Sequence, residues 1–112
     1  MCVLNIMIKK NIIVNAPNPV GNYPHSIEIN GMLYLSGIGP RNEVDNTIPG
    51  NEYNNDGDLI SYDIEQQTHA VFDNIKIILE ESKSCWENLI DITVFLTDMK
   101  NDFIKFNEIY NL

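Results

Sequence analysis

The fold is decided by the stretch SIEINGMLYLS, residues 26–36, in which two runs of alternating polar and apolar residues flank Asn30-Gly31. An Asn-Gly pair between two such runs favours a type I′ turn, because both central residues of that turn need positive φ. The stretch therefore predicts a β-hairpin over residues 26–37.

The segments on either side of this hairpin differ in composition. Residues 1–15 predict an N-terminal extension or edge strand, which ends at Ala16-Pro17-Asn18-Pro19 because proline fixes φ and has no N–H to donate. Residues 37–62 are rich in Gly, Pro, Asn and Asp and predict a long loop with one short strand. Loops of this length in small domains are usually functional or mobile.

The second half of the chain carries two helical patterns and one strand pattern. A helix is predicted over 63–82, where Asp63 and Gln66 resemble a capping box and the apolar face is formed by Ile64, Thr68, Val71, Ile75 and Ile78. A strand is predicted over 89–97, with Ile90, Ile92, Val94 and Leu96 on one face. A shorter helix is predicted over 101–110, with a stripe of Phe103, Phe106, Asn107 and Tyr110.

Composition restricts the class of protein. The 112 residues allow one domain, and 7 basic against 16 acidic side chains give a formal charge of −9. This charge argues against nucleic-acid binding and against an anionic membrane surface, since both need clustered cations. The N-terminal apolar run is interrupted by Lys9 and Lys10, too early to span a bilayer. Cys2 and Cys85 form no disulfide framework, so a cytoplasmic location is expected.

The familiar chemical motifs are incomplete. His25, His69 and the two cysteines share no ligand spacing, so no metal site is predicted. Residues 52–63 resemble an EF-hand loop but have Glu and Asp at its two ends, where Asp and Glu are needed. Gly37-Ile38-Gly39 lacks the third glycine of a dinucleotide fingerprint.

Three residues remain as candidates for ligand contact. Gly37 stands at the end of the hairpin and lets a ligand approach its backbone N–H. Tyr23 precedes a proline, is held extended and could present its hydroxyl to a cleft. Asn107 is a polar residue on an otherwise aromatic stripe. Each also has an ordinary structural explanation, as a turn glycine, a surface tyrosine and a capped asparagine.

Several motifs, taken in order, resemble the RidA/YjgF/UK114 (reactive intermediate deaminase) family over residues 15–110. They are NAP at 15–17, GNYPHS at 21–26, LSG at 35–37, QT at 67–68, DNIKIILE at 73–80, DITVFLTDM at 91–99, NDF at 101–103 and FNEIY at 106–110. The Tyr-Pro-His variant at 23–25, with residues 39–50, is most similar to the 2-aminomuconate-deaminase-like branch of the family.

The resemblance implies an α+β, chorismate-mutase-like fold, in which a mixed sheet carries two helices on one face. It also implies a homotrimer with ligand clefts between subunits, and an enzyme without a cofactor that hydrolyses reactive enamines or imines to keto acids and ammonia. Tyr23, Gly37, Asn107 and Phe103 match the substrate-binding positions of the family. The match makes residues 1–112 a single RidA-like domain.

The resemblance also implies closing strands after the second helix, which carry the family's carboxylate-binding arginine and an acidic residue that activates water. Neither residue occurs before Leu112, so the sequence is expected to be a C-terminally truncated copy with its catalytic residues unknown. Arg41, the chain's single arginine, lies in a different loop and does not match the family arginine. The alternatives are a non-catalytic member that binds small carboxylates or acts as a chaperone, and the ribonuclease activity assigned to parts of the family, which the charge disfavours.

Overall fold

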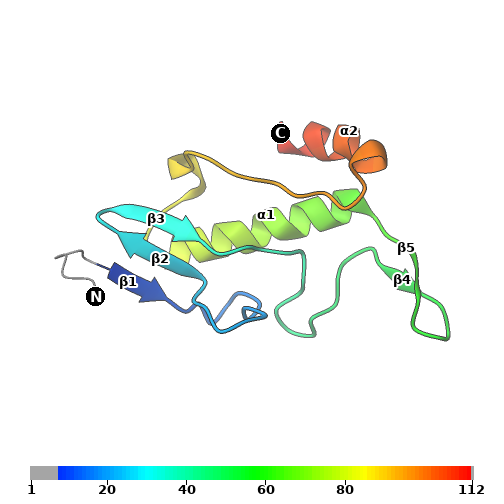
Figure 1. Ribbon diagram of the computed structural model, residues 1–112, viewed down its shortest axis with the longest axis horizontal. Helices are drawn as coiled ribbons and strands as arrows, with labels where there is room; N and C mark the ends of the chain where they lie inside the picture. Colours follow the sequence, from blue (N-terminus) through cyan, green and yellow to red (C-terminus); the bar gives the residue numbers. More distant parts are fainter. Residues whose placement is uncertain (1–7, 112) are drawn as a thin grey trace, which may run out of the picture.

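The computed structural model describes residues 8–111, which form an antiparallel sheet, a small hairpin and two helices (Figure 1). The elements, in chain order, are β1 (Ile8–Asn11), β2 (Ser26–Ile29), β3 (Met32–Leu35), β4 (Glu52–Tyr53), β5 (Leu59–Ser61), α1 (Ile64–Glu81), the 3₁₀ turn η1 (Trp86–Asn88) and α2 (Met99–Tyr110). The three-stranded sheet has the order β1-β2-β3, and β4 pairs with β5 in a separate two-stranded sheet.

The predicted hairpin is confirmed as β2 and β3. Ile29 pairs with Met32 across the turn, and Asn30 and Gly31 have φ values of 51° and 81°. These positive angles are the ones that a two-residue type I′ turn requires. The predicted edge strand is confirmed for β1, which pairs antiparallel with β2; residues 1–7 of that prediction lie outside the described residues.

The predicted long helix is confirmed as α1, and its start is fixed by an N-cap. The Asp63 carboxylate accepts hydrogen bonds from the backbone N–H groups of Glu65 and Gln66, at 2.9 and 3.2 Å. These bonds satisfy donors that the first helical turn cannot pair internally. The Gln66 side-chain amide also donates to Asp63 Oδ2, at 3.0 Å. This differs from a full capping box, in which the side chain would accept from the backbone of the cap.

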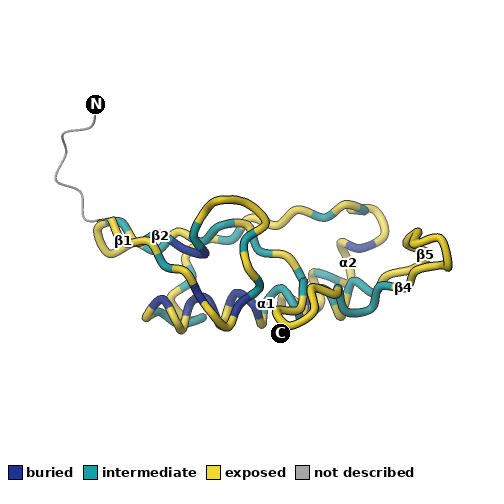
Figure 2. The backbone as a smooth tube through the Cα atoms, turned by 90° about the horizontal axis from the view of Figure 1, so that it is seen from below, coloured by how far each residue is buried: buried dark blue, intermediate teal, exposed yellow. Residues whose placement is uncertain are grey.

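The apolar core lies between α1 and the N-terminal sheet. Ile78 of α1 packs with Ile13 and Ala16, and all three side chains are buried. Leu35 of β3 contacts this cluster from the sheet. Figure 2 shows the buried residues concentrated along α1 and around β2. Burial of these side chains holds α1 against one face of the sheet, because removing apolar surface from water is the dominant favourable term in folding.

The predicted strand over 89–97 is wrong. These residues run as an extended connection from η1 to α2, alongside α1 (Figure 1). Among the described residues, no backbone hydrogen bond joins 90–97 to another segment. A strand requires a neighbour that pairs its N–H and C=O groups, which alternation alone does not supply. Both sheets within residues 8–111 are consequently antiparallel, and the parallel pairing that a mixed sheet needs is missing from this part of the chain.

The loop after β3 has more structure than predicted. It contains two short strands, β4 and β5, instead of one, and they form a hairpin that extends from the N-terminal end of α1 (Figure 1). Gly50 precedes this hairpin with φ of +83°, and a Cβ added there would lie 2.6 Å from the Cβ of Asp63. A glycine is therefore needed where the loop passes the N-cap of α1.

The second predicted helix is confirmed as α2, which begins two residues earlier than predicted and packs against α1. Phe72 of α1 contacts Phe106 and Tyr110 of α2, with ring centroids 6.2 and 6.0 Å apart. The predicted stripe is mostly exposed: Phe103, Asn107 and Tyr110 are exposed and Phe106 is half-buried, while Asp102 and Ile109 take the buried positions. Of the helices in residues 8–111, none is long and apolar enough to cross a membrane.

Candidate functional site

A cavity of about 220 Å³ lies between residues 17–23 and the end of β3, and we call it the Tyr23 cavity. Its lining includes two of the four predicted site residues, Tyr23 and Gly37, together with Ser36 and Arg41. Tyr23 is 41% exposed. A Cβ added to Gly37 would meet no atom within 4 Å, so the chain itself leaves the space beside this backbone empty. Both features are compatible with contact to a small ligand.

His25 holds the wall of the Tyr23 cavity in place. Its Nδ1 accepts a hydrogen bond from the Ile13 N–H at 2.8 Å, and its Nε2 donates to the Pro17 carbonyl at 2.9 Å. The ring is therefore the neutral tautomer with its proton on Nε2. Both ring nitrogens are occupied and the residue is only 4% exposed. His25 thus acts as a structural link between the segments around β1 and β2.

The loop that carries Arg41 is anchored to α1. Asn74, a buried residue of the helix, donates its side-chain amide to the carbonyls of Gly39 and Arg41, at 3.0 Å each. The Ser36 hydroxyl donates to the Pro24 carbonyl at 2.8 Å, which connects the end of β3 to the residue after Tyr23. These bonds fix the backbone around the cavity, because their donors and acceptors come from separate segments of the chain.

The other two predicted site residues lie elsewhere. Phe103 and Asn107 are on the exposed part of α2, and neither lines the Tyr23 cavity. Within the described residues the predicted site is therefore divided into two pairs. The sequence predicts one site from all four residues, but residues 8–111 of a single chain do not bring them together.

Sequence reasoning missed the position of Arg41 in this cavity and the role of Asn74 in holding it. The two residues are 33 positions apart, and their contact depends on the path of the loop over α1. The available signal was weak: Arg41 is the chain's single arginine and follows Gly39-Pro40 in the loop after the hairpin.

A second, larger depression lies between β3, α1 and residues 88–97, and we call it the β3 groove. Its floor is apolar and includes Val71, Phe72 and Ile75 of α1. At one end, Tyr62 donates its hydroxyl to Asp102 Oδ2 at 2.8 Å, and this bond raises the pKa of Tyr62. The groove's lining contains no lysine, arginine or histidine, so it offers no cation to an anionic ligand.

Metal ligands are not clustered in the described part of the chain. Residues 8–111 contain no group of three or more His, Cys, Asp or Glu side chains that could hold a metal ion. His69 is exposed on α1. Cys85 is a free, half-buried thiol beside η1, and Cys2 lies outside the described residues.

These features define a small α+β protein with a ligand-sized cavity at the end of a three-stranded sheet. Comparison with known proteins gives the family: the sequence model described as Endoribonuclease L-PSP matches residues 13–112. The chain belongs to this family, which is the RidA/YjgF family that the motifs resemble. Comparison with solved structures confirms the predicted YjgF-type fold class.

Individual relatives support this assignment. A RutC family protein of Pyrococcus horikoshii is 36% identical over 99 residues, a match that covers 86% of this chain and 67% of the relative. The crystal structure of YyfA from Yersinia pestis, a member of the Rid family, has a TM-score of 0.72 and 32% identity, covering 93% of this chain and 73% of that one. E. coli TdcF with bound serine has a TM-score of 0.76 and 27% identity, covering 92% and 71%. The chain spans about two thirds of the length of the curated relatives it matches.

Proposed function

We propose that the chain binds reactive enamine or imine intermediates, similar to 2-aminoacrylate or 2-aminomuconate, and hydrolyses them to keto acids and ammonia. In this reaction water adds to the C=N carbon of the imine, the C–N bond breaks, and nitrogen leaves as ammonia. The observation that carries the proposal is the presence of Tyr23 and Gly37 on one small cavity in a member of the RidA/YjgF family. The serine bound to E. coli TdcF also supports a small amino or keto acid as ligand.

The chemistry available in the Tyr23 cavity is hydrogen bonding. The Tyr23 hydroxyl can orient a substrate nitrogen or oxygen, and the Gly37 N–H can donate to a carboxylate or to oxygen that gains charge as water adds. Proton transfer to the leaving nitrogen needs a positioned acid or base. The lining of the cavity includes no Asp or Glu, and we assign no residue to that step. The proposed reaction uses no cofactor.

We further propose a homotrimer in which the ligand site lies between subunits. The separation of Phe103 and Asn107 from Tyr23 and Gly37 supports this arrangement, because a second copy could supply the missing pair. Light scattering coupled to size exclusion tests it, and a strictly monomeric protein with full activity would contradict it. For the location we propose the cytoplasm.

The alternative is a family member without catalysis, either a binder of small carboxylates, a chaperone-like protein or an inactive truncated copy. For an inactive copy, the 112-residue chain would release little ammonia, and a version extended at its C-terminus would regain activity. Full activity of the short chain would rule out the inactive copy.

The decisive experiment measures ammonia release from 2-aminoacrylate generated in solution, with the full chain present or absent. We expect faster release with the wild-type chain, and a loss of this increment in Tyr23→Phe. The matched control is Tyr53→Phe, since Tyr53 lies in β4 and does not line the cavity. Ligand-induced stabilisation without any increase in ammonia release would favour the non-catalytic alternative.

A further inference from the structure

His25 connects two parts of the chain through a buried ring. Its Nδ1 accepts from the Ile13 N–H and its Nε2 donates to the Pro17 carbonyl, so the neutral ring uses both nitrogens. Both partners belong to the segment that follows β1. Within that segment, Ile13 and Ala16 pack with Ile78 in the core. The ring therefore helps to hold residues 12–17 against the rest of the fold.

The backbone of His25 is fixed independently of its ring. Its N–H donates to the Asn11 carbonyl at 2.9 Å, and its carbonyl accepts from the Ser36 N–H at 3.1 Å. These two bonds keep the residue beside β1 and β3 whatever the state of the imidazole. A change in the ring consequently acts on residues 12–17 and leaves the pairing of the sheet in place.

A second proton on the ring would change its bonding to Ile13. An imidazolium has an N–H at both nitrogens and accepts at neither. With a proton on Nδ1, two donors face each other, and the Ile13 N–H loses its acceptor. The Nε2–H can still donate to the Pro17 carbonyl. Since Ile13 is buried, its unpaired N–H costs free energy comparable to a lost hydrogen bond.

The cavity beside His25 offers no anion to a charged ring. Neither of the ion pairs within residues 8–111 involves this histidine. Tyr23 and Arg41 are the other titratable side chains that line the Tyr23 cavity, and neither carries a negative charge at neutral pH. The guanidinium of Arg41 is itself positive, so it disfavours a further positive charge on the same cavity.

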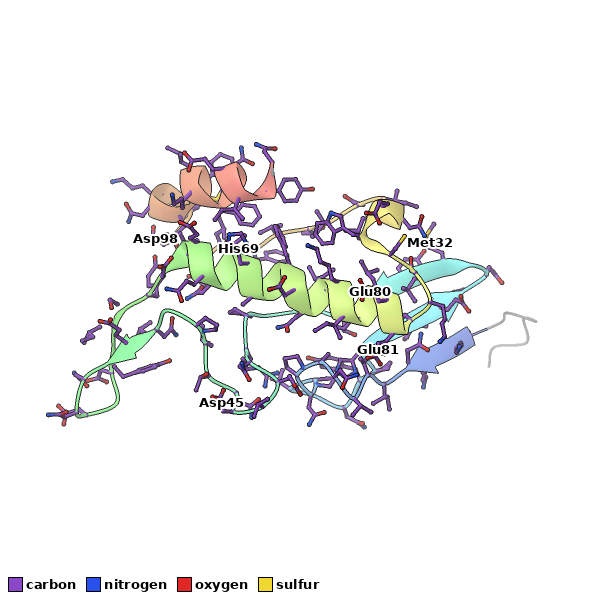
Figure 3. All side chains as sticks on the ribbon, turned by 180° about the vertical axis from the view of Figure 1, so that it is seen from behind. Met32, Asp45, His69, Glu80, Glu81 and Asp98 are labelled. Atoms are coloured by element: carbon purple, nitrogen blue, oxygen red, sulfur yellow. The ribbon has the colours of Figure 1, made fainter. Side chains whose placement is uncertain are left out.

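The elements packed around His25 do not supply an anion either. β1 and β3 contact the residue through backbone groups, which carry no net charge. From α1, the residue that lines the cavity is Ile78. The carboxylate of Glu81, at the C-terminal end of α1 (Figure 3), accepts from the Asn15 side chain on the exposed surface. A protonated His25 would thus be a buried charge without an ion-pair partner, which is a costly state.

We propose that protonation of His25 in mild acid releases residues 12–17 and opens the Tyr23 cavity. Residues 17–20 form one wall of that cavity, and the bond between the ring and Ile13 anchors the segment leading to it. An imidazole in water gains its proton at roughly pH 6.5. The released segment leaves the ring free to bind a proton that the closed form excludes. The closed form therefore loses stability as the pH falls.

This inference concerns the fold around the cavity and does not depend on turnover or on a ligand. It is tested without substrate, by signals from the ring of His25 and from backbone amides. The proposed hydrolysis is tested at neutral pH by release of ammonia. Failure of one is therefore distinguishable from failure of the other.

The direct test follows the full 112-residue chain by NMR as the pH is lowered. The titration runs from about pH 7.5 to about pH 5.5, which brackets the value for a free imidazole. Ring nitrogen shifts report the proton on His25, and hydrogen exchange reports protection of the Ile13 N–H. We expect the protection factor of Ile13 to fall at least about tenfold as the ring is protonated, because one buried hydrogen bond is lost. The N–H of Ile75, within α1, should keep its protection.

Two variants separate the effects of the two histidines. A glutamine is neutral at every pH and can both accept and donate, so His25→Gln is expected to keep the protection of Ile13 constant across the titration. The matched control is His69→Gln. His69 is exposed on α1 (Figure 3) and does not line the cavity, so this variant is expected to retain the pH dependence of the wild type.

The wild type and His69→Gln keep the proposal testable even if His25→Gln fails to fold. Protonation of the His25 ring with unchanged protection at Ile13 would overturn it, and so would a ring that stays neutral at the acid end of the titration. Wild-type pH dependence in a folded His25→Gln variant would also contradict it. Equal losses of protection at Ile13 and Ile75 would show global unfolding instead of local release, and would likewise overturn the proposal.

Discussion

The β2–β3 hairpin and the 89–97 segment have similar alternating sequences but different structures. In the hairpin, Asn30-Gly31 brings two strands together over a connection of two residues, so each strand finds its partner locally. Segment 89–97 has no such turn beside it and pairs with no described strand. Phe95 and Ile90 in this segment are 90% and 79% exposed. Alternation therefore specifies which residues share a face, whereas strand formation also depends on a partner.

The edge of β3 shows the same dependence on a partner. Ser36 donates its N–H to the His25 carbonyl. In an antiparallel pair, every second residue directs its N–H and C=O groups to the partner strand. Leu33 and Leu35 therefore point these groups away from β2. This edge borders the β3 groove, and 89–97 lies on the other side of that groove. Unpaired edges and exposed apolar residues are features that proteins usually cover.

The largest expected difference between the two regions is in core packing. Ile78→Ala should lower the free energy of unfolding by about 2–5 kcal/mol, since it opens a cavity in the buried cluster that Ile78 forms with Ile13 and Ala16. Ile90→Ala, the matched change in the exposed segment, should alter it by less than about 0.5 kcal/mol. Urea unfolding followed by circular dichroism measures both. Equal losses would show that 89–97 is packed in solution as tightly as the core.

An intermediate effect is expected at the turn of the hairpin. Gly31→Ala should cost about 1–2 kcal/mol, because a side chain is strained in the left-handed region that Gly31 occupies. The control is Gly39→Ala, where a Cβ would meet no atom within 4 Å and φ is not positive. Thermal unfolding of the two variants gives the difference. If both variants matched the wild type, the local turn would not determine the pairing of β2 with β3.

The smallest effect concerns pH and the start of α1. Hydrogen bonds from the side chain and backbone of Gln66 hold the pKa of Asp63 below its usual 3.8. A carboxyl group whose pKa is lowered by folding stabilises the folded state at any pH above its ordinary pKa. This contribution is lost as the pH falls through the lowered pKa. Helicity should therefore decrease slightly more in the wild type than in Asp63→Asn as the solution is acidified below 3.8. Identical pH profiles would show that ionisation of Asp63 does not contribute.

The parts of the fold that sequence reasoning predicted correctly are the ones with local causes. The hairpin depends on Asn30-Gly31, the start of α1 on Asp63, and both helices on a repeat of apolar residues. The parts that it missed depend on contacts between distant segments. The strand over 89–97 requires a neighbour, and the buried face of α2 is set by Phe72 and Tyr62, which lie in or next to α1.

The candidate site, like the fold, has some residues that local sequence predicts and others that depend on contacts between distant segments. The motifs predict Tyr23 and Gly37 as site residues, and the structure places both on one cavity. Arg41 does not match the family arginine, and the contacts of its loop with Asn74 bring it to that cavity. Phe103 and Asn107 match the family by sequence, yet residues 8–111 of a single chain leave them apart from the other two.

The family, the charge, the hairpin and the two helices follow from residue type and spacing over short distances. That 89–97 is unpaired among the described residues, and that Arg41 lines the same cavity as Tyr23, follows from contacts between distant segments. The physical reason is that pairing of strands and the position of a charge both depend on groups that the chain brings together from distant positions.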